Sequence, residues 1–567
     1  MAKILYVYRR DENTRENLYK IGKALDQLFG FASCQTRSVN IQDGNNYLYI
    51  FNPEINTILR EGFNLCVGSL TKPENLWWEK GKSKNTPLTI LNRKTEICIY
   101  ADILGSRTLW FYQDEKVFLA STSQRAMIVY LRSFIWNPQA ATWMLATGCT
   151  GPGYAWDCRF KALGPGGTIR FNKRTWKIQH ENTSITFSPL NQEDNWRKRM
   201  ADMLASSITE TNIDLSNFVL TLSGGYDSRA ALYYLKGKLK HTLSWGLEQY
   251  LQDKHTDAYV AQILATQLQT QHHFFKTNQN NLDFDFVVDR FIEAGEGRVD
   301  HIQTHTDGLA MWSKIAAKGF VGVIRADEVF GWLPVQNELD TRLSVGFNNL
   351  HDFANLKSAE FYGLEPQVIP EFYCRRDSEI IEDWRDRLYQ QYRISYIQTG
   401  LHELVYPYVE LLNPLLLDAI VELTHQLPAT WRTSKRLYAK VVSSLIPAVD
   451  FATKPSIPEV EDIVKGPSVV EIIREEITAI SAQHYLSAVL VNEIIDKMEK
   501  SQQVAHQIEA NWRVNVRKHI PFAIKKMLRR SIMQYRMDPN QLAFRNYLIL
   551  RVANRLEKDK QLLGEYV

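Results

Sequence analysis

The sequence has little cysteine, no long hydrophobic run and no early signal segment. Six cysteines in 567 residues are too few for a disulfide-stapled scaffold, and none of them has the spacing of a zinc site. They are expected to be reduced and mostly buried. No apolar run reaches the roughly 18–20 residues that cross a bilayer, and the first residues become charged too early for a signal peptide. These absences predict a cytoplasmic protein without a membrane span.

An excess of charge of one sign is also missing. The chain carries 67 basic and 63 acidic residues, a formal net charge of +4, so bulk charge gives no reason to expect a nucleic-acid partner. One run, Arg513 to Arg536, holds eight basic residues and no acid. It is interpreted as a solvated helix face, with a patch for an acidic peptide or a membrane surface as the alternative.

Composition and length indicate an ordinary globular protein of several domains. Apolar residues make up 45% and charged residues 23%, which excludes a disordered or coiled-coil chain. The length predicts about three or four domains. Residues 1–175 contain short strands separated by turn signals, with helices expected at 16–28 and 122–131, and so predict a mixed α+β domain. Residues 176–195 are polar and irregular and are expected to be a linker.

From residue 196 the pattern changes to strands that alternate with helices of 10–15 residues. This alternation predicts a doubly wound α/β domain with a parallel sheet over residues 196–460. The expected strands cover residues 218–222, 242–245, 272–275 and 320–324. Beyond residue 400 the chain is expected to be mostly helical, and residues 461–567 are expected to form a helical C-terminal extension.

The first strand of this second domain runs directly into the sequence S-G-G-Y-D-S at residues 223–228 and then into a helix. Glycines let the backbone approach a ligand closely, and the N–H groups of such a turn, with the helix end, form an anion site. A carboxylate beside a phosphate site is repulsive unless a metal bridges the two, so Asp227 indicates Mg²⁺. The Walker lysine pattern is absent, which excludes a P-loop kinase.

This loop resembles that of the pyrophosphatase-loop (PP-loop) ATP hydrolases, which cleave ATP to AMP and pyrophosphate. Three further segments narrow the resemblance. V-I-R-A-D-E-V-F-G at 323–331 resembles G-E-G-A-D-E-L-F-G, the segment at 101–112 resembles R-D-x-x-G-x-x-P-L-Y-Y, and L-G-P-G at 163–166 resembles L-P-P-G. In order, over roughly residues 90–455, the chain resembles the asparagine-synthetase superfamily.

The resemblance implies an Ntn-hydrolase-like, glutamine-amidotransferase-like sandwich, followed by a PP-loop synthetase domain of the adenine nucleotide alpha hydrolase type. It implies ATP and Mg²⁺ as ligands, with the metal on Asp227 and Asp327. The residues that it assigns to the nucleotide are Leu222, Ser223, Gly224, Gly225, Asp227, Ser228, Trp245, Gly322 and Val323.

Two catalytic residues follow from the same resemblance. Lys454 lies on a proline-containing loop expected to close over ATP, where a lysine stabilises the charge that develops as an acyl-adenylate collapses; the alternative is a surface lysine. Glu410 falls on the glutamate of the family's E-x-R-x-P-F-L-D segment and is the candidate acid or base; the alternative is a structural carboxylate. Lys435 is a further candidate for phosphate contact.

The chain departs from asparagine synthetases at two positions. The family's nucleophilic cysteine follows the initiator methionine, where this chain has Ala2, and its first cysteine is Cys34. A methyl group cannot replace a thiolate, so we expect no ammonia production from glutamine. The family's glutamate in G-E-G, a tyrosine in β-lactam synthetases, falls on Ile324, which cannot transfer a proton.

The segment between Asp327 and Glu410 has 82 residues, more than in asparagine synthetases, and lasso-peptide cyclases are similarly extended. One interpretation is an enlarged pocket for a peptide or a bulky acid, and the other is an insertion with its own small core. Its aromatic residues are Trp332, Phe347, Phe353, Phe361, Tyr362, Phe372 and Tyr373.

The sequence therefore favours an ATP-dependent carbon–nitrogen ligase that adenylates a small-molecule or peptide carboxylate and couples it to an amine. Macrolactam or lactam cyclisation, as in lasso-peptide cyclases and β-lactam synthetases, is included, with a leader-peptide-binding protein or a protease as a further candidate partner. The alternatives are ammonia-dependent asparagine-synthetase-type amidation and a degenerate ATP-binding scaffold. NAD synthetases and tRNA-modifying enzymes are a third class, against which the N-terminal domain argues.

Overall fold

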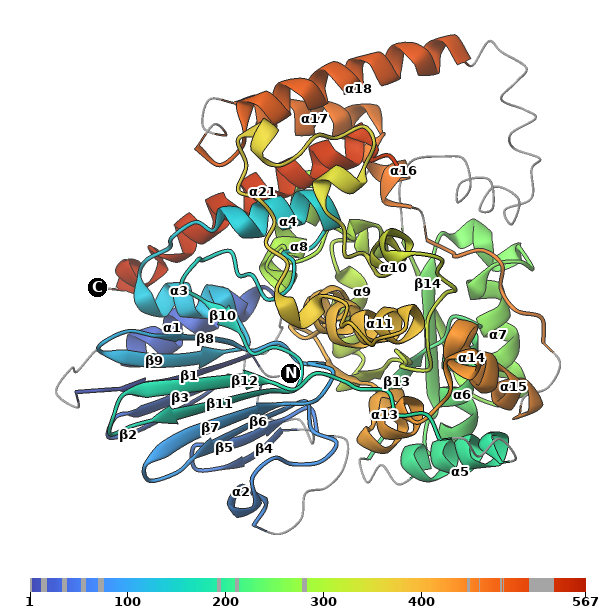
Figure 1. Ribbon diagram of the computed structural model, residues 1–567, viewed down its shortest axis with the longest axis horizontal. Coiled ribbons are helices and arrows are strands. Elements are labelled where there is room, and N and C mark those ends of the chain that lie inside the picture. Colours follow the sequence, from blue (N-terminus) through green and yellow to red (C-terminus); the bar gives the residue numbers. More distant parts are fainter. Residues whose placement is uncertain are drawn as a thin grey trace.

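The structure is a computed structural model. It describes residues 3–11, 18–32, 38–52, 58–69, 76–190, 195–209, 214–277, 283–445, 449–457, 459–479, 482, 484–508 and 535–566. Ala2, Cys34 and most of the basic run (residues 513–534) lie outside them. The fold is mixed α/β, with two antiparallel sheets, one parallel sheet and a helical C-terminal region (Figure 1).

The two antiparallel sheets have six strands each and the orders β10-β8-β9-β1-β3-β2 and β12-β11-β7-β6-β5-β4. The first contains β1 (Lys3–Arg9), β2 (Ser38–Asp43), β3 (Asn46–Phe51), β8 (Trp110–Gln113), β9 (Val117–Ser121) and β10 (Lys161–Ala162). The second contains β4 (Ile58–Glu61), β5 (Asn64–Val67), β6 (Leu88–Asn92), β7 (Glu96–Ala101), β11 (Gly167–Asn172) and β12 (Lys177–Asn182).

Alternation along the strands makes the two sheets a sandwich. Ile4 and Tyr6 of β1 share one buried core with Ile90 and Ile99 of the other sheet, because successive side chains of a strand point to opposite faces. The rings of Phe118 and Phe171 stack across this core, with centroids 4.6 Å apart. The helices of this part are α1 (Leu18–Phe29), α2 (Trp77–Lys80), α3 (Gln124–Leu131) and α4 (Pro138–Thr147).

The strand β12 lies within residues that were expected to be a linker, so that expectation is wrong for 177–182. Its six residues pair antiparallel with β11, from Gly167 opposite Asn182 to Asn172 opposite Lys177. It is an edge strand with almost every side chain exposed. A strand that buries neither face carries no alternation of apolar residues, which is why its sequence resembles a loop.

The predicted parallel sheet is confirmed, with the order β15-β14-β13-β16-β17. Every neighbouring pair is parallel. The strands are β13 (Phe218–Thr221), β14 (His241–Gly246), β15 (Gln271–Lys276), β16 (Gly322–Ile324) and β17 (Glu410–Leu412). The helix α5 (Trp196–Thr209) precedes the first of these strands, and the helices between the strands include α6 (Tyr226–Leu235), α7 (Asp257–Gln267), α8 (Phe284–Gly295) and α9 (Ala310–Ala317).

The fifth strand, β17, falls where the chain was expected to be helical. Its three residues are all buried. A buried run of only three residues cannot be assigned to strand or helix by periodicity. Only its pairing with β16, 88 positions earlier at Gly322 opposite Glu410, makes it a strand.

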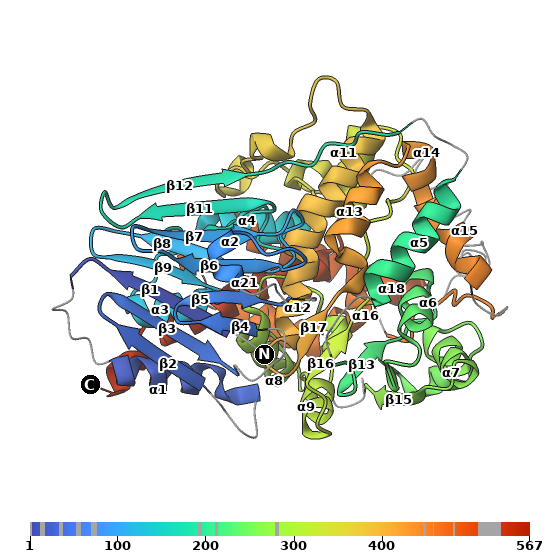
Figure 2. The same cartoon turned by 90° about the horizontal axis from the view of Figure 1, so that it is seen from below.

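One continuous helical stretch lies between the sandwich and the parallel sheet (Figure 2). It consists of α11 (Ile381–Leu388), the π-helical segment η7 (Tyr389–Gln398) and α12 (Thr399–Val405). Gln391 donates to the carbonyl oxygen of Ile103 in the sandwich at 3.2 Å, and Gln390 donates to that of Val329 beyond β16 at 3.0 Å. This helical stretch therefore links the loop that follows β16 to the sandwich through hydrogen bonds.

The long segment before α11 contains α10 (Glu338–Val345) and packs on the sandwich side of the molecule. Phe347 stacks on Trp143 of α4 with centroids 5.4 Å apart, and Tyr373 donates a hydrogen bond to Tyr396 of η7 at 3.0 Å. Phe347 and Tyr373 are both buried. Both side chains pack between elements of the fold. This position favours an insertion with its own small core over an aromatic substrate pocket.

The remaining helices are α13 (Asp418–His425), α14 (Ala429–Arg432), α15 (Arg436–Leu445), α16 (Val460–Val464), α17 (Pro467–Thr478), α18 (Ala488–Ile508) and α21 (Pro539–Asp559). The helix α21 contacts α17 and α18 and also α3, α4 and α8. Its Arg545 Nε lies 2.7 Å from Asp300 Oδ2, so the C-terminal region is tied into the rest of the molecule.

Among the described residues, no helix is long and apolar enough to cross a membrane. The five described cysteines are free thiols; Cys66, Cys98 and Cys149 are buried, whereas Cys158 and Cys374 are exposed.

Candidate functional site

The turn after β13 has the backbone that its sequence predicts. Gly224 has φ +70°, and a Cβ there would lie 2.6 Å from Cγ1 of Val260. Only glycine fits both the left-handed conformation and the close approach. Gly225 precedes α6 as its N-cap residue, and the hydroxyl oxygens of Ser223 and Ser228 lie 3.4 Å apart on the two sides of the turn. Backbone N–H groups and hydroxyls are thereby gathered at a helix N-terminus, which is a favourable place for an anion.

A cleft of about 260 Å³ opens at the carboxyl ends of β13, β14 and β16. Pockets for small ligands typically enclose about 300–1,000 Å³, so this cleft is close to the lower end of that range. Its lining residues are Thr221, Leu222, Ser223, Asp227, Ser228, Ser244, Trp245, Asp257, Arg325, Ala326, Asp327 and Ile457.

Most of the residues expected to bind nucleotide come together in this cleft. Leu222, Ser223, Asp227, Ser228 and Trp245 line it, and Gly224 and Gly225 form the turn beside it. Gly322 and Val323 do not line it, because both are buried within β16. A Cβ at Gly322 would lie 2.0 Å from the ring of Phe218, so that glycine serves the packing of neighbouring strands.

Asp227 shares a lysine with Glu328, whose carboxylate is buried. Lys435 Nζ lies 2.8 Å from Asp227 Oδ2 and 3.0 Å from Glu328 Oε1. Burial raises the pKa of Asp227, and the charge of Asp327 raises it further, while Lys435 opposes the shift. Burial also raises the pKa of Glu328, to about 7, against the same lysine. For Lys435 itself, burial disfavours the ammonium, but the two carboxylates outweigh it and raise its pKa.

Asp327 has the opposite electrostatic surroundings. His402 Nε2 lies 2.8 Å from its Oδ2, and Arg325 Nη2 lies 3.3 Å from its Oδ1. Burial alone would raise the pKa of this carboxyl, but Arg325 and His402 outweigh burial and lower it. Asp327 is therefore ionised at neutral pH. Since an ionised carboxylate only accepts hydrogen bonds, Nε2 of His402 must carry the proton that it shares.

Asp227 and Asp327 fit the metal that the sequence predicts. Asp227 lies in the first turn of α6, which follows β13, and Asp327 follows the neighbouring strand β16; both line one cleft. Among the described residues, Oδ1 of Asp227 is buried without a hydrogen-bond partner, which is costly unless a ligand completes it. Carboxylate oxygens suit Mg²⁺, which is commonly bound by one or two carboxylates together with substrate phosphates and water. The described residues form no cluster of three or more His, Cys, Asp or Glu side chains that could hold a metal alone.

The loop that carries Lys454 borders the cleft, but the lysine side chain does not line it. The backbone N–H of Asp257 donates to the carbonyl oxygen of Lys454 at 3.1 Å, and Ile457 reaches the cleft wall. Lys454 Nζ itself lies 2.8 Å from Asp253 Oδ2, and its side chain is 55% exposed. Its catalytic role stays a prediction, one that requires the side chain to turn from Asp253 towards the cleft.

Glu410 lies away from the cleft lining. It is fully buried at the start of β17, with Oε1 3.4 Å from Nη1 of Arg107 in the sandwich. The guanidinium of Arg107 in turn lies over the ring of Tyr406, 3.4 Å from its centroid. The structure therefore gives Glu410 an ion pair between the sandwich and the parallel sheet. This position favours the structural alternative, and a role in proton transfer remains a prediction without geometric support.

Sequence reasoning missed the roles of His402 and Arg325 and underrated Lys435. His402 lies 75 positions from Asp327 inside a helical stretch, where no local motif marks it. Arg325 lies two residues before Asp327 in the V-I-R-A-D-E-V-F-G segment, so the sequence could have predicted a positive charge close to this carboxylate. Comparison of the chain with protein-family models and with curated proteins finds no match.

Proposed function

We propose that the protein is an ATP-dependent synthetase that adenylates a carboxylate and transfers it to an amine, with AMP and pyrophosphate as the other products. The observation that carries the proposal is the convergence of the residue 223–228 turn, Asp227 and Asp327 on one cleft. A scaffold would need no such set of phosphate-binding donors and oxygen ligands in one place.

We propose the same assignment for the folds. The facing antiparallel sheets are those expected of an Ntn-hydrolase-like sandwich, and the parallel sheet with its turn after β13 is that expected of a PP-loop domain. The turn stands at the carboxyl end of a central strand, where parallel α/β sheets bind their ligands.

The residues of the cleft suggest how the reaction is divided. The N–H groups of the 223–228 turn and the hydroxyls of Ser223 and Ser228 donate to phosphate oxygens of ATP. Asp227 and Asp327 would hold Mg²⁺, which would supply positive charge that neutralises the phosphates. Lys435 adds a cation beside Asp227. A carboxylate oxygen of the substrate attacks the α-phosphorus and pyrophosphate leaves; the amine then attacks the acyl carbon and AMP leaves.

The amine does not come from glutamine in this proposal, because Ala2 offers no nucleophile. It belongs to the substrate itself, as in a lactam or macrolactam cyclisation, or to a second molecule. Incubation with glutamine, ATP and Mg²⁺ is expected to release no glutamate above background. Stoichiometric glutamate would contradict this part of the proposal.

The direct test is a nucleotide analysis with a panel of amino acids and peptides as carboxylate donors. The expected products are AMP and pyrophosphate, and Asp227→Asn should remove them while the circular dichroism spectrum stays unchanged. The matched control is Asp559→Asn, a buried carboxylate of α21 that is bound by Arg125 at 2.6 Å and should keep full turnover. Formation of ADP and phosphate, or full turnover by Asp227→Asn, would sink the proposal.

A further inference from the structure

Lys435 contacts Asp227, a residue of the cleft lining, from an unusual turn. Two consecutive residues that are not glycine, Ser434 with φ 58° and Lys435 with φ 55°, adopt the left-handed conformation. A side chain with a Cβ disfavours this conformation, and two in succession persist only where the surrounding structure holds them. The position of the Lys435 ammonium therefore depends on whatever fixes the turn.

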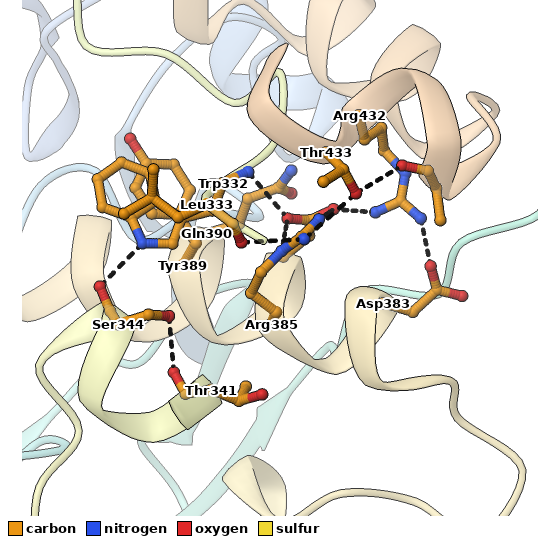
Figure 3. Close-up of polar contacts among 12 residues, drawn as sticks. Trp332, Leu333, Thr341, Ser344, Asp383, Arg385, Tyr389, Gln390, Arg432 and Thr433 are labelled. Atoms are coloured by element: carbon orange, nitrogen blue, oxygen red, sulfur yellow. Dashed lines mark hydrogen bonds and ion pairs between the residues drawn. The ribbon is translucent and has the colours of Figure 1, made fainter. Parts of the chain in front are cut away.

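Arg432, two residues before this turn, is anchored by charged side chains (Figure 3). The guanidinium of Arg432 donates to Asp386 through Nη1 and to Asp383 through Nη2, and its Nε donates to the carbonyl oxygen of Leu427 at 3.0 Å. Arg385 binds both oxygens of the same Asp386, at 2.9 Å and 3.0 Å. Asp386 is fully buried and Arg432 is 1% exposed. A buried carboxylate thus joins two arginines, one of them next to the turn.

The same network also holds the loop that follows Glu328. The backbone N–H of Trp332 donates to Asp386 Oδ1 at 3.2 Å, and that of Ser434 donates to the carbonyl oxygen of Trp332 at 2.9 Å. Gly331 allows this approach, because it has φ +115° and a Cβ there would lie 2.1 Å from the carbonyl oxygen of Arg432. Asp386 is therefore hydrogen-bonded directly to the loop that follows Glu328. Through Arg432 it is also linked to the segment that leads into the Ser434–Lys435 turn.

From this geometry we propose that Asp386 and Arg432 are positioning residues that hold the ammonium of Lys435 between Asp227 and Glu328. They touch neither carboxylate themselves. Asp386 holds Arg432 and the backbone of Trp332 in place. Arg432 and Trp332 hold the Ser434–Lys435 turn, and the turn sets the direction of the Lys435 side chain. That this serves catalysis rests on the proposed function, but the positioning itself is a property of the folded chain and can be measured without a substrate.

The first test measures the reactivity of Lys435 in the full-length protein without nucleotide. Asp386→Asn keeps the shape of the side chain and removes the charge that the two arginines share. Labelling with acetic anhydride, read by mass spectrometry, should acylate Lys435 at least about threefold faster in this variant, because an ion-paired amine that is released becomes more accessible. Asp559→Asn is the control, since Asp559 is also buried and lies between two arginines, Arg125 at 2.6 Å and Arg555 at 3.4 Å.

An unchanged labelling rate in folded Asp386→Asn would overturn the proposal. If that variant does not fold, Arg432→Lys replaces it, because a single ammonium cannot reproduce the three contacts that the planar guanidinium makes with Asp386, Asp383 and the carbonyl oxygen of Leu427; faster labelling supports the proposal and unchanged labelling overturns it. Ser434→Gly added to Asp386→Asn should restore slow labelling, since glycine adopts the left-handed turn without the penalty of a Cβ.

The second test asks whether the loss of activity passes through Lys435. Asp386→Asn should lower pyrophosphate exchange by at least about tenfold, and in a Lys435→Met background the same change should have no further effect, because residues that act through one another are not additive. Additive losses would mean that Asp386 supports the fold in general and would overturn the proposal. Absence of exchange in the wild type would contradict the proposed function, and the labelling test would still decide the positioning.

Discussion

His402 Nε2 lies 2.8 Å from Asp327 Oδ2, so a helix that packs on the sandwich holds a carboxylate of the cleft. The next residue of that helix, Glu403, contacts Lys3 of β1 and lies 3.8 Å from Nη1 of Arg298. His402 and Glu403 are each 1% exposed. One turn of α12 therefore joins the first strand of the sandwich to the cleft.

The ion pair of Lys3 and Glu403 is expected to stabilise the whole fold. Lys3→Met leaves Glu403 buried with the two remaining cations Arg107 and Arg298, and breaking a buried pair by removing one partner costs about 3–5 kcal/mol. Urea denaturation should show a loss of unfolding free energy of that order. The control is Lys276→Met, which removes an ion pair with Glu248 whose lysine is 63% exposed and should change stability by less than about 1 kcal/mol. A similar small loss for both variants would refute the structural role.

Glu328 makes part of the stability depend on pH. Its pKa is raised from 4.5 to about 7 in the folded protein, chiefly by burial. The folded state therefore holds a proton that the unfolded state has lost, and wild-type stability falls as pH rises through this window. The Glu328→Gln variant has no carboxyl to titrate at this position and does not lose this stability. The unfolding free energy of the variant minus that of the wild type should therefore rise by up to about 3 kcal/mol between about pH 5 and pH 8.

The measurement is urea denaturation of both proteins across this range. Asp300→Asn is a control that should show no pH dependence in this range, since Arg545 and His301 outweigh burial and lower the pKa of Asp300 from 3.8 to about 2, so Asp300 is ionised in both states above about pH 5. A constant difference between wild type and Glu328→Gln at all pH values would show that Glu328 does not titrate there.

Replacement of Lys435 and replacement of Lys454 should impair different steps of the reaction. Lys435→Met removes the cation beside Asp227 and should lower pyrophosphate exchange by about 10²–10³-fold, the usual effect of losing a preorganised charge. Lys454 is paired with Asp253 and mostly exposed. If its loop closes as the sequence predicts, Lys454→Ala should lower amide formation by at least about 10²-fold and lower exchange much less.

Parallel assays of exchange and amide formation distinguish the two lysines. Amide formation by Lys454→Ala within about threefold of wild type would remove Lys454 from the mechanism, because a charge that acts in the transition state contributes far more than that. Full exchange by Lys435→Met would instead show that its contact with Asp227 is purely structural.

The parts of the molecule that the sequence predicts are those fixed by neighbouring residues. The strand, the turn at Gly224 and the helix that follows depend on local apolar pattern and on glycine, and all three are found as expected. The strand β17 depends on a partner 88 positions away, at Gly322 opposite Glu410. The contact of Lys435 with Asp227 spans 208 positions. Packing between distant segments decides such features, and a single sequence does not display it.

Glu410 is a second case in which packing between distant segments gives a residue a contact that the sequence did not predict. Motif similarity placed it as an acid or base, whereas its carboxylate lies 3.4 Å from Arg107, with both side chains 1% exposed. Removing the charge of Glu410 leaves that arginine buried without full compensation, which costs about 3–5 kcal/mol when a buried pair is broken. Glu410→Gln should therefore lower the unfolding free energy by a few kcal/mol, up to that range.

Below its melting temperature, the same variant should lower exchange and amide formation by the same factor, because a structural carboxylate acts on both steps alike. A general base for the amine would instead lower amide formation alone, by about 10²–10⁴-fold, and leave exchange intact. Arg107→Met is the matched control, since it removes the other half of the pair and can touch no substrate proton. If Arg107→Met and Glu410→Gln give the same ratio of exchange to amide formation, Glu410 joins the sandwich to the sheet; if only Glu410→Gln shifts the ratio towards exchange, it is the base.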